Sequence, residues 1–241
     1  MKRIAILQSN YIPWKGYFDI LGSVDEFVVY DEVQYTKNDW RNRNVIKASK
    51  GPLWLTIPVR HTGRFGQTID STEVSDPRWT KKHWQTLVTY YSKAPYFGSV
   101  GEVLEETYRQ CQGEKYLSAV NLRFIRVVAA LLGITTPIVS SRDIPGGGDR
   151  NERLLDICLS AGADSYLSGP AARGYLDEAK FSGAGVTVNW MDYSGYPEYP
   201  QLHGAPFIHE VSVLDLLLCV GPEQARHFMR CLPAGCLSGA V

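Results

Sequence analysis

The chain has few cysteines and no metal-binding spacing. Its 241 residues include five cysteines, none in a CxxC pair and none spaced from a histidine as metal ligands are. An odd number without scaffold spacing argues against a disulfide framework. Cys158 and Cys219 are therefore expected to be small core residues on helices. We expect no metal ligands, and the sequence assigns no cofactor.

The chain also lacks an excess of charge and a long apolar run. Lys plus Arg and Asp plus Glu both number 25, so no basic surface indicates a nucleic acid partner. The most apolar stretch, 211–220, is interrupted by Ser212 and Asp215 and is too short to span a membrane. The apolar run 4–7 is too short for a signal peptide. We expect a cytoplasmic protein without a membrane span; the sequence does not indicate an oligomeric state.

The motifs that mark common enzyme classes are missing. The sequence has no GxSxG, P-loop, GxGxxG or HExxH, so it does not support a marked hydrolase, kinase, dinucleotide-binding protein or zinc protease. Nucleotidyltransferases that open with HxGH use two histidines at the start of their first helix. Here the same spacing reads Trp14-Lys15-Gly16-Tyr17. The missing histidines argue against adenylyl transfer by that mechanism.

Short apolar runs alternate with helical segments along the chain. The runs at 4–7 and 25–31 are separated by a helix-length segment at 16–21, which predicts a βαβ opening. Further strands are expected at 54–59, 136–141, 164–169 and 186–191. Helices are expected at 76–92, 100–110, 117–132, 152–161, 174–181 and 212–218. The pattern predicts one Rossmann-like α/β domain over residues 1–241, with a mostly parallel sheet, flanking helices and a C-terminal helical tail at 221–241.

The loops after the first two strands are the main binding candidates, because such sheets place functional loops at the carboxyl ends of their strands. A helix follows the first loop, and its free N–H groups favour an anion. The second loop runs into a polar and aromatic stretch, 35–44, whose arginines suit phosphate and whose aromatic rings can stack on a base or sugar. A solvated hairpin explains that composition equally well. The candidates are Gln8, Asn10, Tyr11, Trp14, Lys15, Gln34, Tyr35, Trp40, Arg41, Asn42 and Arg43.

Two glycine-containing loops are weaker candidates. The turn that begins with Ser168 and Gly169 can bind phosphate through backbone N–H groups, although a purely structural turn also explains its glycines. The run Gly146–Gly148 follows a predicted strand and is expected at the same sheet edge as the other loops. It is read either as the hinge of a lid or as a tolerated surface insertion.

His83 is the histidine singled out for catalysis. It shares a predicted helix with Trp79, Lys82 and Trp84, and a neighbouring cation lowers a histidine pKa toward the neutral form that a general base needs. A half-buried histidine that serves helix packing is the competing interpretation.

The chain resembles the WbqC-like protein family of bacterial O-antigen and other surface-polysaccharide gene clusters over about residues 1–220. The resemblance rests on the segments 8–18, 30–37, 40–44, 55–59, 83–84, 93–97, 162–163, 166–169 and 213–217. For this family a glycine or related aminoacyl transfer to a sugar has been suggested.

We therefore expect a transferase that uses a small-molecule donor and a nucleotide-linked sugar or similar small anionic acceptor, in an acyl or aminoacyl transfer. In this hypothesis Lys15, Arg41 and Arg43 hold the anionic group. His83 or Asp31 deprotonates the acceptor, and Lys37 stabilises the oxyanion. Two alternatives stay open: an enzyme that activates its substrate with ATP and Mg²⁺, as nucleotidyltransferases do, and a non-catalytic nucleotide-sugar or glycan-binding module.

Overall fold

Five short parallel strands carry the fold. The computed structural model describes residues 1–231, in which these strands form one sheet in the order β5-β2-β1-β6-β7. Their bounds are β1 (Arg3–Leu7), β2 (Glu26–Val29), β5 (Ile138–Ser140), β6 (Ser165–Ser168) and β7 (Thr187–Trp190). Each neighbouring pair is parallel. The predicted α/β fold with a mostly parallel sheet is confirmed.

Helices and a hairpin make up the rest of the regular structure. The α-helices are α1 (Lys15–Gly22), α2 (Trp79–Tyr91), α3 (Phe97–Gln110), α4 (Leu117–Leu131), α5 (Arg150–Ser160), α6 (Glu178–Gly183), α7 (Val213–Val220) and α8 (Pro222–Ala225). Three 3₁₀ turns lie at Ser141–Asp143, Pro170–Gly174 and Arg226–Phe228. The hairpin pairs β3 (Arg43–Ala48) with β4 (Gly51–Thr56) in antiparallel register. No helix within residues 1–231 is long and apolar enough to cross a membrane.

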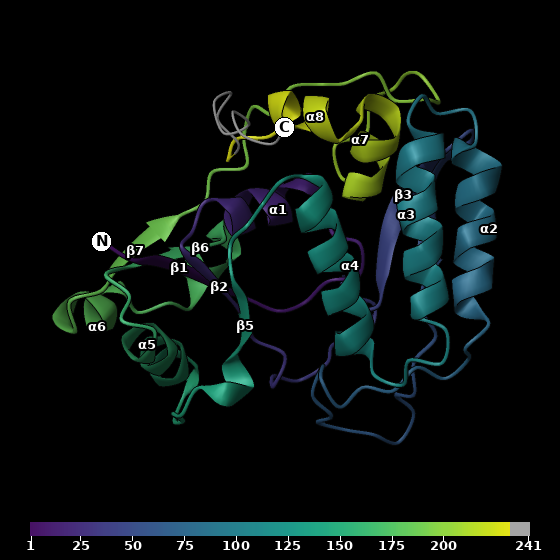
Figure 1. Ribbon diagram of the computed structural model, residues 1–241. Helices are drawn as coiled ribbons and strands as arrows, with labels where there is room; N and C mark the ends of the chain where they lie inside the picture. Colours follow the sequence, from purple (N-terminus) through teal and green to yellow (C-terminus); the bar gives the residue numbers. More distant parts are fainter. Residues whose placement is uncertain (232–241) are drawn as a thin grey trace.

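The two faces of the sheet bury different core clusters. Ile4 and Ile6 pack with Phe181 of α6 and with residues of α5. Ala5, between them, packs in the larger cluster that includes α1, α4 and α7. This alternation follows from the period of two along a strand. Figure 1 shows the result: α5 and α6 lie on one side of the sheet and α1 on the other, with α4 next to α1 and α2 and α3 beyond it.

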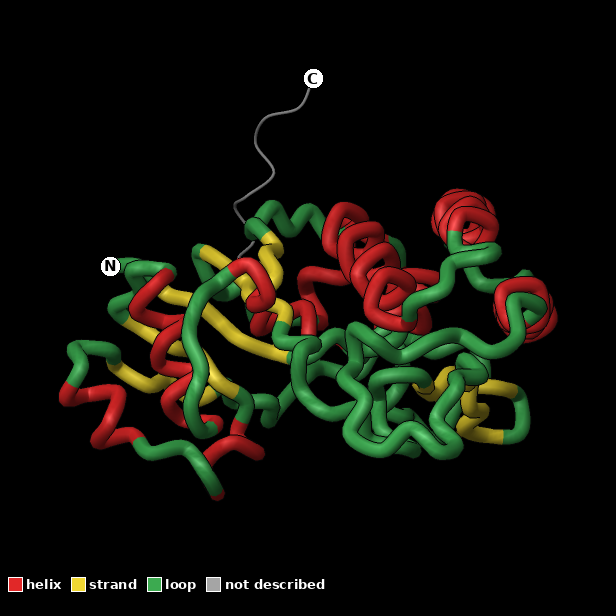
Figure 2. Tube along the Cα trace, turned by 90° about the horizontal axis from the view of Figure 1, so that it is seen from below, coloured by secondary structure: helices red, strands yellow, loops and turns green. Residues whose placement is uncertain are grey.

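The long segment between β2 and β5 forms the second half of the molecule. It contains the hairpin and α2, α3 and α4, and its apolar residues continue the larger core cluster. Figure 2 shows this half at the right, with the strands of the hairpin well separated from the parallel sheet at the left. The rest of the described chain therefore supplies the sheet. The segment between β2 and β5, called the inserted half below, lies beside one edge of that sheet.

The strand order reverses between β1 and β6. From β1 the chain proceeds to β2 and β5 on one side of the sheet, whereas β6 and β7 lie on the other side. In parallel α/β sheets, ligands bind outside the carboxyl ends of the strands at such a reversal. Gln8 and Gly169 begin the segments that leave β1 and β6 at this point. The topology alone thus places a candidate site at this edge.

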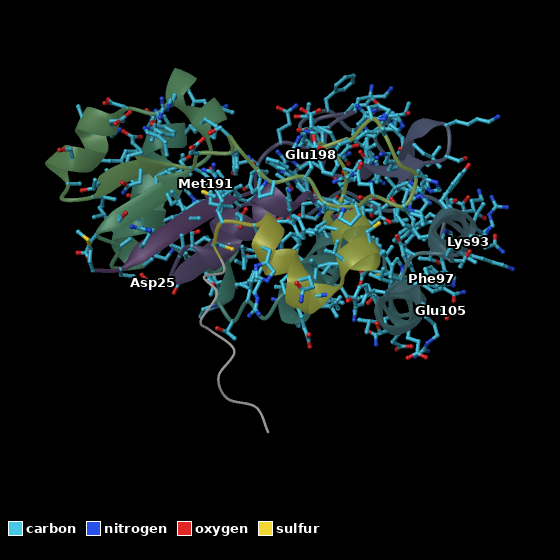
Figure 3. All side chains as sticks on the ribbon, turned by 90° about the horizontal axis from the view of Figure 1, so that it is seen from above. Asp25, Lys93, Phe97, Glu105, Met191 and Glu198 are labelled. Carbon is cyan, nitrogen blue, oxygen red and sulfur yellow. The ribbon has the colours of Figure 1, made fainter. Side chains whose placement is uncertain are left out.

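The segment after β7 crosses from the sheet to the inserted half. In Figure 3 it runs from Met191, beside the sheet, to Glu198, over the helical half. The segment then continues to Ser212, whose hydroxyl accepts a hydrogen bond from Leu214 N and so caps α7. This crossing brings residues far from β1 in sequence over the loop that follows β1.

Several element boundaries differ from those predicted. The strand expected at 54–59 is β4 at Gly51–Thr56. Its partner β3 begins at Arg43, in the last two residues of the stretch 35–44 that was expected to be a loop, and extends to Ala48. The helix expected at 174–181 is a 3₁₀ turn followed by α6. In the expected C-terminal tail, residues 222–228 are helical, whereas 232–241 lie outside the described residues.

The glycine run 146–148 does follow β5, and it lies at the same sheet edge as the loops after β1 and β2, because these strands are parallel. It lines a pocket of about 580 Å³ together with Tyr30, Glu32 and Arg153. None of its residues lines the candidate site described below. Among the described residues, this loop is therefore not closed over that site.

Gly146 and Gly147 should differ sharply when replaced by alanine. Gly146 has φ of +139°, and an added Cβ would lie 2.7 Å from Asp156 Cβ, whereas an added Cβ at Gly147 meets nothing within 4 Å. We expect Gly146→Ala to lower the free energy of unfolding by about 1–2 kcal/mol and Gly147→Ala to leave it nearly unchanged. Urea denaturation of both variants measures this. Equal effects would contradict the described loop conformation.

Candidate functional site

A pocket of about 570 Å³ lies where three strand-end segments meet. It is lined by Asn10, Pro13, Trp14, Trp40, Asn44, Tyr193, Gly195, Tyr196, His209 and Glu210. The first three of these follow β1, the next two belong to the segment after β2, and the last five follow β7. The loop after β1 and the stretch 35–44 thus each contribute residues to this pocket, whereas Lys15, Arg41 and Arg43 are not among its lining residues.

Aromatic rings form one wall of the pocket. The Trp14 indole makes edge-to-face contacts with Tyr193 and Tyr196, with ring centroids 5.1 and 5.8 Å apart. Its ring lies over the first turn of α1, where an added Cβ on Gly16 would stand 2.7 Å from Trp14 Cε2. A side chain at position 16 would therefore displace the indole. This close approach explains why glycine stands two positions after Trp14.

The loop after β1 has a strained backbone next to the pocket. Ile12 has φ of +38°, which is unusual for a β-branched residue, and its side chain is fully buried. Such a conformation persists only where the surroundings fix it, and it is found most often at functional sites. The neighbouring Tyr11 N–H donates to the Trp40 carbonyl at 3.1 Å. This bond joins the loop to the segment that carries Trp40.

Arg41 holds the amide groups of the first loop. Its guanidinium donates to Asn10 Oδ1 and, at 3.3 Å, to Gln8 Oε1, and it lies 3.6 Å from Asp39 Oδ2. Because Asn10 Oδ1 accepts this bond, its Nδ2 group is left to donate to a ligand. Arg41 therefore orients a pocket residue, although the pocket lining itself includes no Lys or Arg.

Asp31 lies beneath the loop rather than in the pocket lining. Its Oδ1 accepts from Ser9 N at 2.7 Å, and its Oδ2 accepts from Ser9 Oγ at 2.6 Å and from Ser118 Oγ. Burial raises the pKa of Asp31, and the three hydrogen bonds from Ser9 and Ser118 oppose this rise. Both oxygens are occupied, so Asp31 is placed to join β1, β2 and α4.

Lys15 is buried behind the aromatic wall. Its ammonium donates to the Pro197 carbonyl at 3.3 Å and stands 4.7 Å from the centre of the Tyr196 ring. Burial lowers the pKa of Lys15 to about 8, and the nearby Asp19 carboxylate opposes this shift. Lys15 thus supports Tyr196 and Pro197 from below.

Asp19 anchors the same segment. It is fully buried, and it accepts hydrogen bonds from the Tyr196 hydroxyl and from the backbone N–H groups of Arg230 and Cys231 at 2.9 and 3.0 Å. The Arg230 guanidinium in turn donates to Asp192 Oδ2 at 3.0 Å. The helix α1 is therefore tied both to the pocket wall and to the last described residues.

Seven lining residues were not among the sequence-based candidates: Pro13, Asn44, Tyr193, Gly195, Tyr196, His209 and Glu210. Tyr193 and Tyr196 follow β7 directly, so the rule about strand ends, extended to the last strand, would have found them. His209 and Glu210 are exposed, and they lie 19 and 20 residues beyond the end of β7. No local pattern marks them, because only the return of the chain over Trp14 brings them to the pocket.

Other sequence-based candidates lie outside the pocket lining. Lys37 and Gln34 are exposed, whereas Tyr35, Asn42 and Ser168 are buried. Asn42 Nδ2 donates to the Ile57 carbonyl at 2.8 Å, which makes it a structural contact.

Two candidates lie beside lining residues. Gly169 lies near Tyr193, whose hydroxyl would be 3.8 Å from an added Cβ. Arg43 stacks on Trp54, with its guanidinium carbon 4.2 Å from the ring centre. Gly169 thus lies next to the pocket wall, and Arg43 places its charge next to the pocket rather than in it.

His83 lies in the core, and it is not among the lining residues of this pocket. Its Nε2 is 3.2 Å from the Thr56 carbonyl, which can only accept, so Nε2 carries the proton. Its Nδ1 then accepts from the Tyr11 hydroxyl at 2.8 Å, and Tyr108 donates to Tyr11 at 2.7 Å. Burial, more than the charge of Lys82, lowers the pKa of His83 to about 4. This chain of bonds joins α2 and α3 to the loop after β1.

The four cysteines of the described part are free. Cys111, Cys158 and Cys219 are buried, as expected for the last two, and burial raises the pKa of each thiol to about 12. Within residues 1–231 no group of three His, Cys, Asp or Glu side chains is arranged to hold a metal ion. Cys236 lies outside the described residues.

Comparison with known proteins gives a family match and a relative that aligns along nearly the whole chain. A model of the WbqC-like protein family matches residues 8–227. The uncharacterized protein Rv1507c of Mycobacterium tuberculosis is 45% identical over 231 residues, which cover 96% of this chain and 99% of that protein. No solved structure matches the chain.

The buried His83 should make stability depend on pH. Its folded pKa of about 4 lies below the ordinary value of 6.5, so the unfolded chain binds a proton first as the pH falls. Its contribution is complete above pH 6.5 and is lost as the pH falls toward 4. Between pH 7 and pH 5 we expect a loss of about 2 kcal/mol.

Denaturation of the wild type and of His83→Gln at both pH values isolates this effect, since glutamine does not titrate. The wild type should lose more stability than the variant. Equal losses, or a ring pKa of 6.5 or higher by proton NMR, would contradict the buried neutral state.

Proposed function

The chain belongs to the WbqC-like protein family, and we propose that it is a transferase that adds an acyl or aminoacyl group to a nucleotide-linked sugar in surface-polysaccharide or related biosynthesis. The proposal rests on the pocket that the segments after β1, β2 and β7 line together. A volume of about 570 Å³ accommodates a sugar, and pockets of this kind combine apolar walls with a few polar groups.

The composition of the pocket supports this substrate class. Trp14, Trp40, Tyr193 and Tyr196 offer ring faces on which a sugar can stack, and Asn10, His209 and Glu210 offer hydrogen bonds to its hydroxyl groups. The single observation that carries the proposal is the meeting of these aromatic faces with an exposed histidine and carboxylate.

The proposed chemistry uses residues that line the pocket. His209 accepts a proton from the acceptor hydroxyl or amine as that group attacks the donor carbonyl. A new bond forms to the carbonyl carbon, the bond to the donor's leaving group breaks, and the proton is available to that leaving group. Asn10 Nδ2, oriented by Arg41, is placed to donate to the oxyanion. His209 and Asn10 thus replace His83, Asp31 and Lys37 in the hypothesis, since those three do not line the pocket.

Thermal-shift and product assays test the substrate class. We expect nucleoside diphosphate sugars to raise the melting temperature through ligand linkage, and the same sugars to gain an acyl mass when acyl thioesters or aminoacyl donors are added. Stabilisation by ATP with Mg²⁺ alone would instead favour carboxylate activation. Stabilisation by nucleotide sugars without product from any donor would favour a binding module.

His209→Asn should lower the turnover about 10²–10⁴-fold with little change in melting temperature, because an exposed general base contributes to the reaction and not to packing. His227→Asn is the matched control, since His227 is also exposed and does not line the pocket. Full activity of His209→Asn would remove it as the base.

A further inference from the structure

Trp54 extends the pocket beyond its lining. Its ring stacks on that of Trp40, with centroids 5.5 Å apart and planes inclined by 28°. Despite this contact, Trp40 is 41% and Trp54 44% exposed. Two large apolar rings exposed side by side at the rim of a pocket indicate a ligand surface. We call Trp40, Trp54 and Arg43 the platform.

The backbone holds the platform in place. The Trp40 N–H donates to Asp39 Oδ1 at 2.7 Å, and its carbonyl accepts from Tyr11 N. Trp54 lies in β4 directly opposite Val45 of β3, so the hairpin fixes its position. A ring held in this way loses little conformational entropy when a ligand stacks on it.

Arg43 adds positive charge to the platform. Its guanidinium lies over Trp54 and donates to the Asn38 carbonyl, and its Nε is buried without a hydrogen-bond partner among the described residues. No carboxylate pairs with Arg43 in that part of the chain. A guanidinium without a carboxylate partner, beside exposed aromatic rings, matches a phosphate joined to a base.

The pocket itself has the opposite character. Its lining contains the Glu210 carboxylate and no Lys or Arg, so a diphosphate is disfavoured there. The platform and the pocket share Trp40 and therefore form one continuous surface with two chemically different ends.

We propose that the platform binds the nucleoside diphosphate part of the substrate, with its base against the exposed surface of Trp40 and Trp54 and its phosphates at Arg43, while the sugar enters the pocket. This inference rests on the proposed function and adds to it the direction in which the substrate lies. It also assigns Trp54, which no motif of the sequence marked, as a binding residue.

Calorimetric binding of three probes tests the proposal: uridine diphosphate, uridine, and methyl glucoside. Trp54→Ala should weaken binding of uridine diphosphate and uridine about 10-fold, equivalent to 1.4 kcal/mol, and leave methyl glucoside unaffected. Trp54→Phe should restore most of the affinity. Arg43→Gln should weaken uridine diphosphate but not uridine.

Tyr175→Ala is the matched control, since Tyr175 is 46% exposed and carries Arg150 at 4.4 Å, yet lies outside the pocket lining. It should bind all three probes as the wild type does. Unchanged binding of uridine diphosphate by Trp54→Ala, or no binding by the wild type, would overturn the proposal. If Trp54→Ala weakened the binding of methyl glucoside as much as that of uridine, the platform would bind a sugar ring and not the base, which would also overturn the proposal. A failure of the transferase proposal can be distinguished from a failure of this binding proposal. In the first case the assays would yield no acylated product, although the three probes would still bind as described.

Discussion

The parallel pairing of β1 with β2 on one side and with β6 on the other is the constraint on which the site depends. It sends every strand of the sheet out at one edge, so that long connecting segments must begin there. The segments after β1, β2 and β7 then converge around Trp14, although they span residues 8 to 212. Without this shared direction, the aromatic wall and the polar side chains would face different sides of the molecule.

Buried carboxylates fix these segments in place. Asp31 joins the loop after β1 to α4, Asp19 joins α1 to Tyr196, and Asp215 accepts from the hydroxyls of Tyr91 and Tyr199 at 2.7 Å. Burying a carboxylate is costly unless hydrogen bonds compensate, and each of these accepts several. Each carboxylate therefore favours one arrangement of its segments over others. The strained Ile12 backbone can persist because the loop around it is held so firmly.

Much of the fold could be predicted because most strands are short apolar runs and most helices have the expected period. The position and pairing of the hairpin could not be predicted, although a hairpin was one interpretation of 35–44 and a strand was expected at 54–59. β3 begins with Arg43 and Asn44, and β4 contains Pro52, which all favour a loop. Asn44 is nevertheless buried, where its side chain accepts from Val45 N and donates to the Tyr11 carbonyl. The surroundings of His83 could not be predicted either. Its neighbours in the helix are visible in the sequence, but Tyr11 and Tyr108, which complete its chain of hydrogen bonds, come from distant segments.

The distribution of charge around the site explains why the cations singled out from sequence are absent from the pocket lining. Arg41 uses its donors on Gln8 and Asn10, and Lys15 is buried against Tyr196 and the Pro197 carbonyl. Both shape the pocket from behind, where direct contact with a ligand would require breaking existing bonds. The positive charge that a ligand can reach lies at the rim, on Arg43. The lining of the pocket contains the exposed carboxylate of Glu210. A ligand with an anionic and a neutral end therefore experiences a preferred direction before any specific hydrogen bond forms.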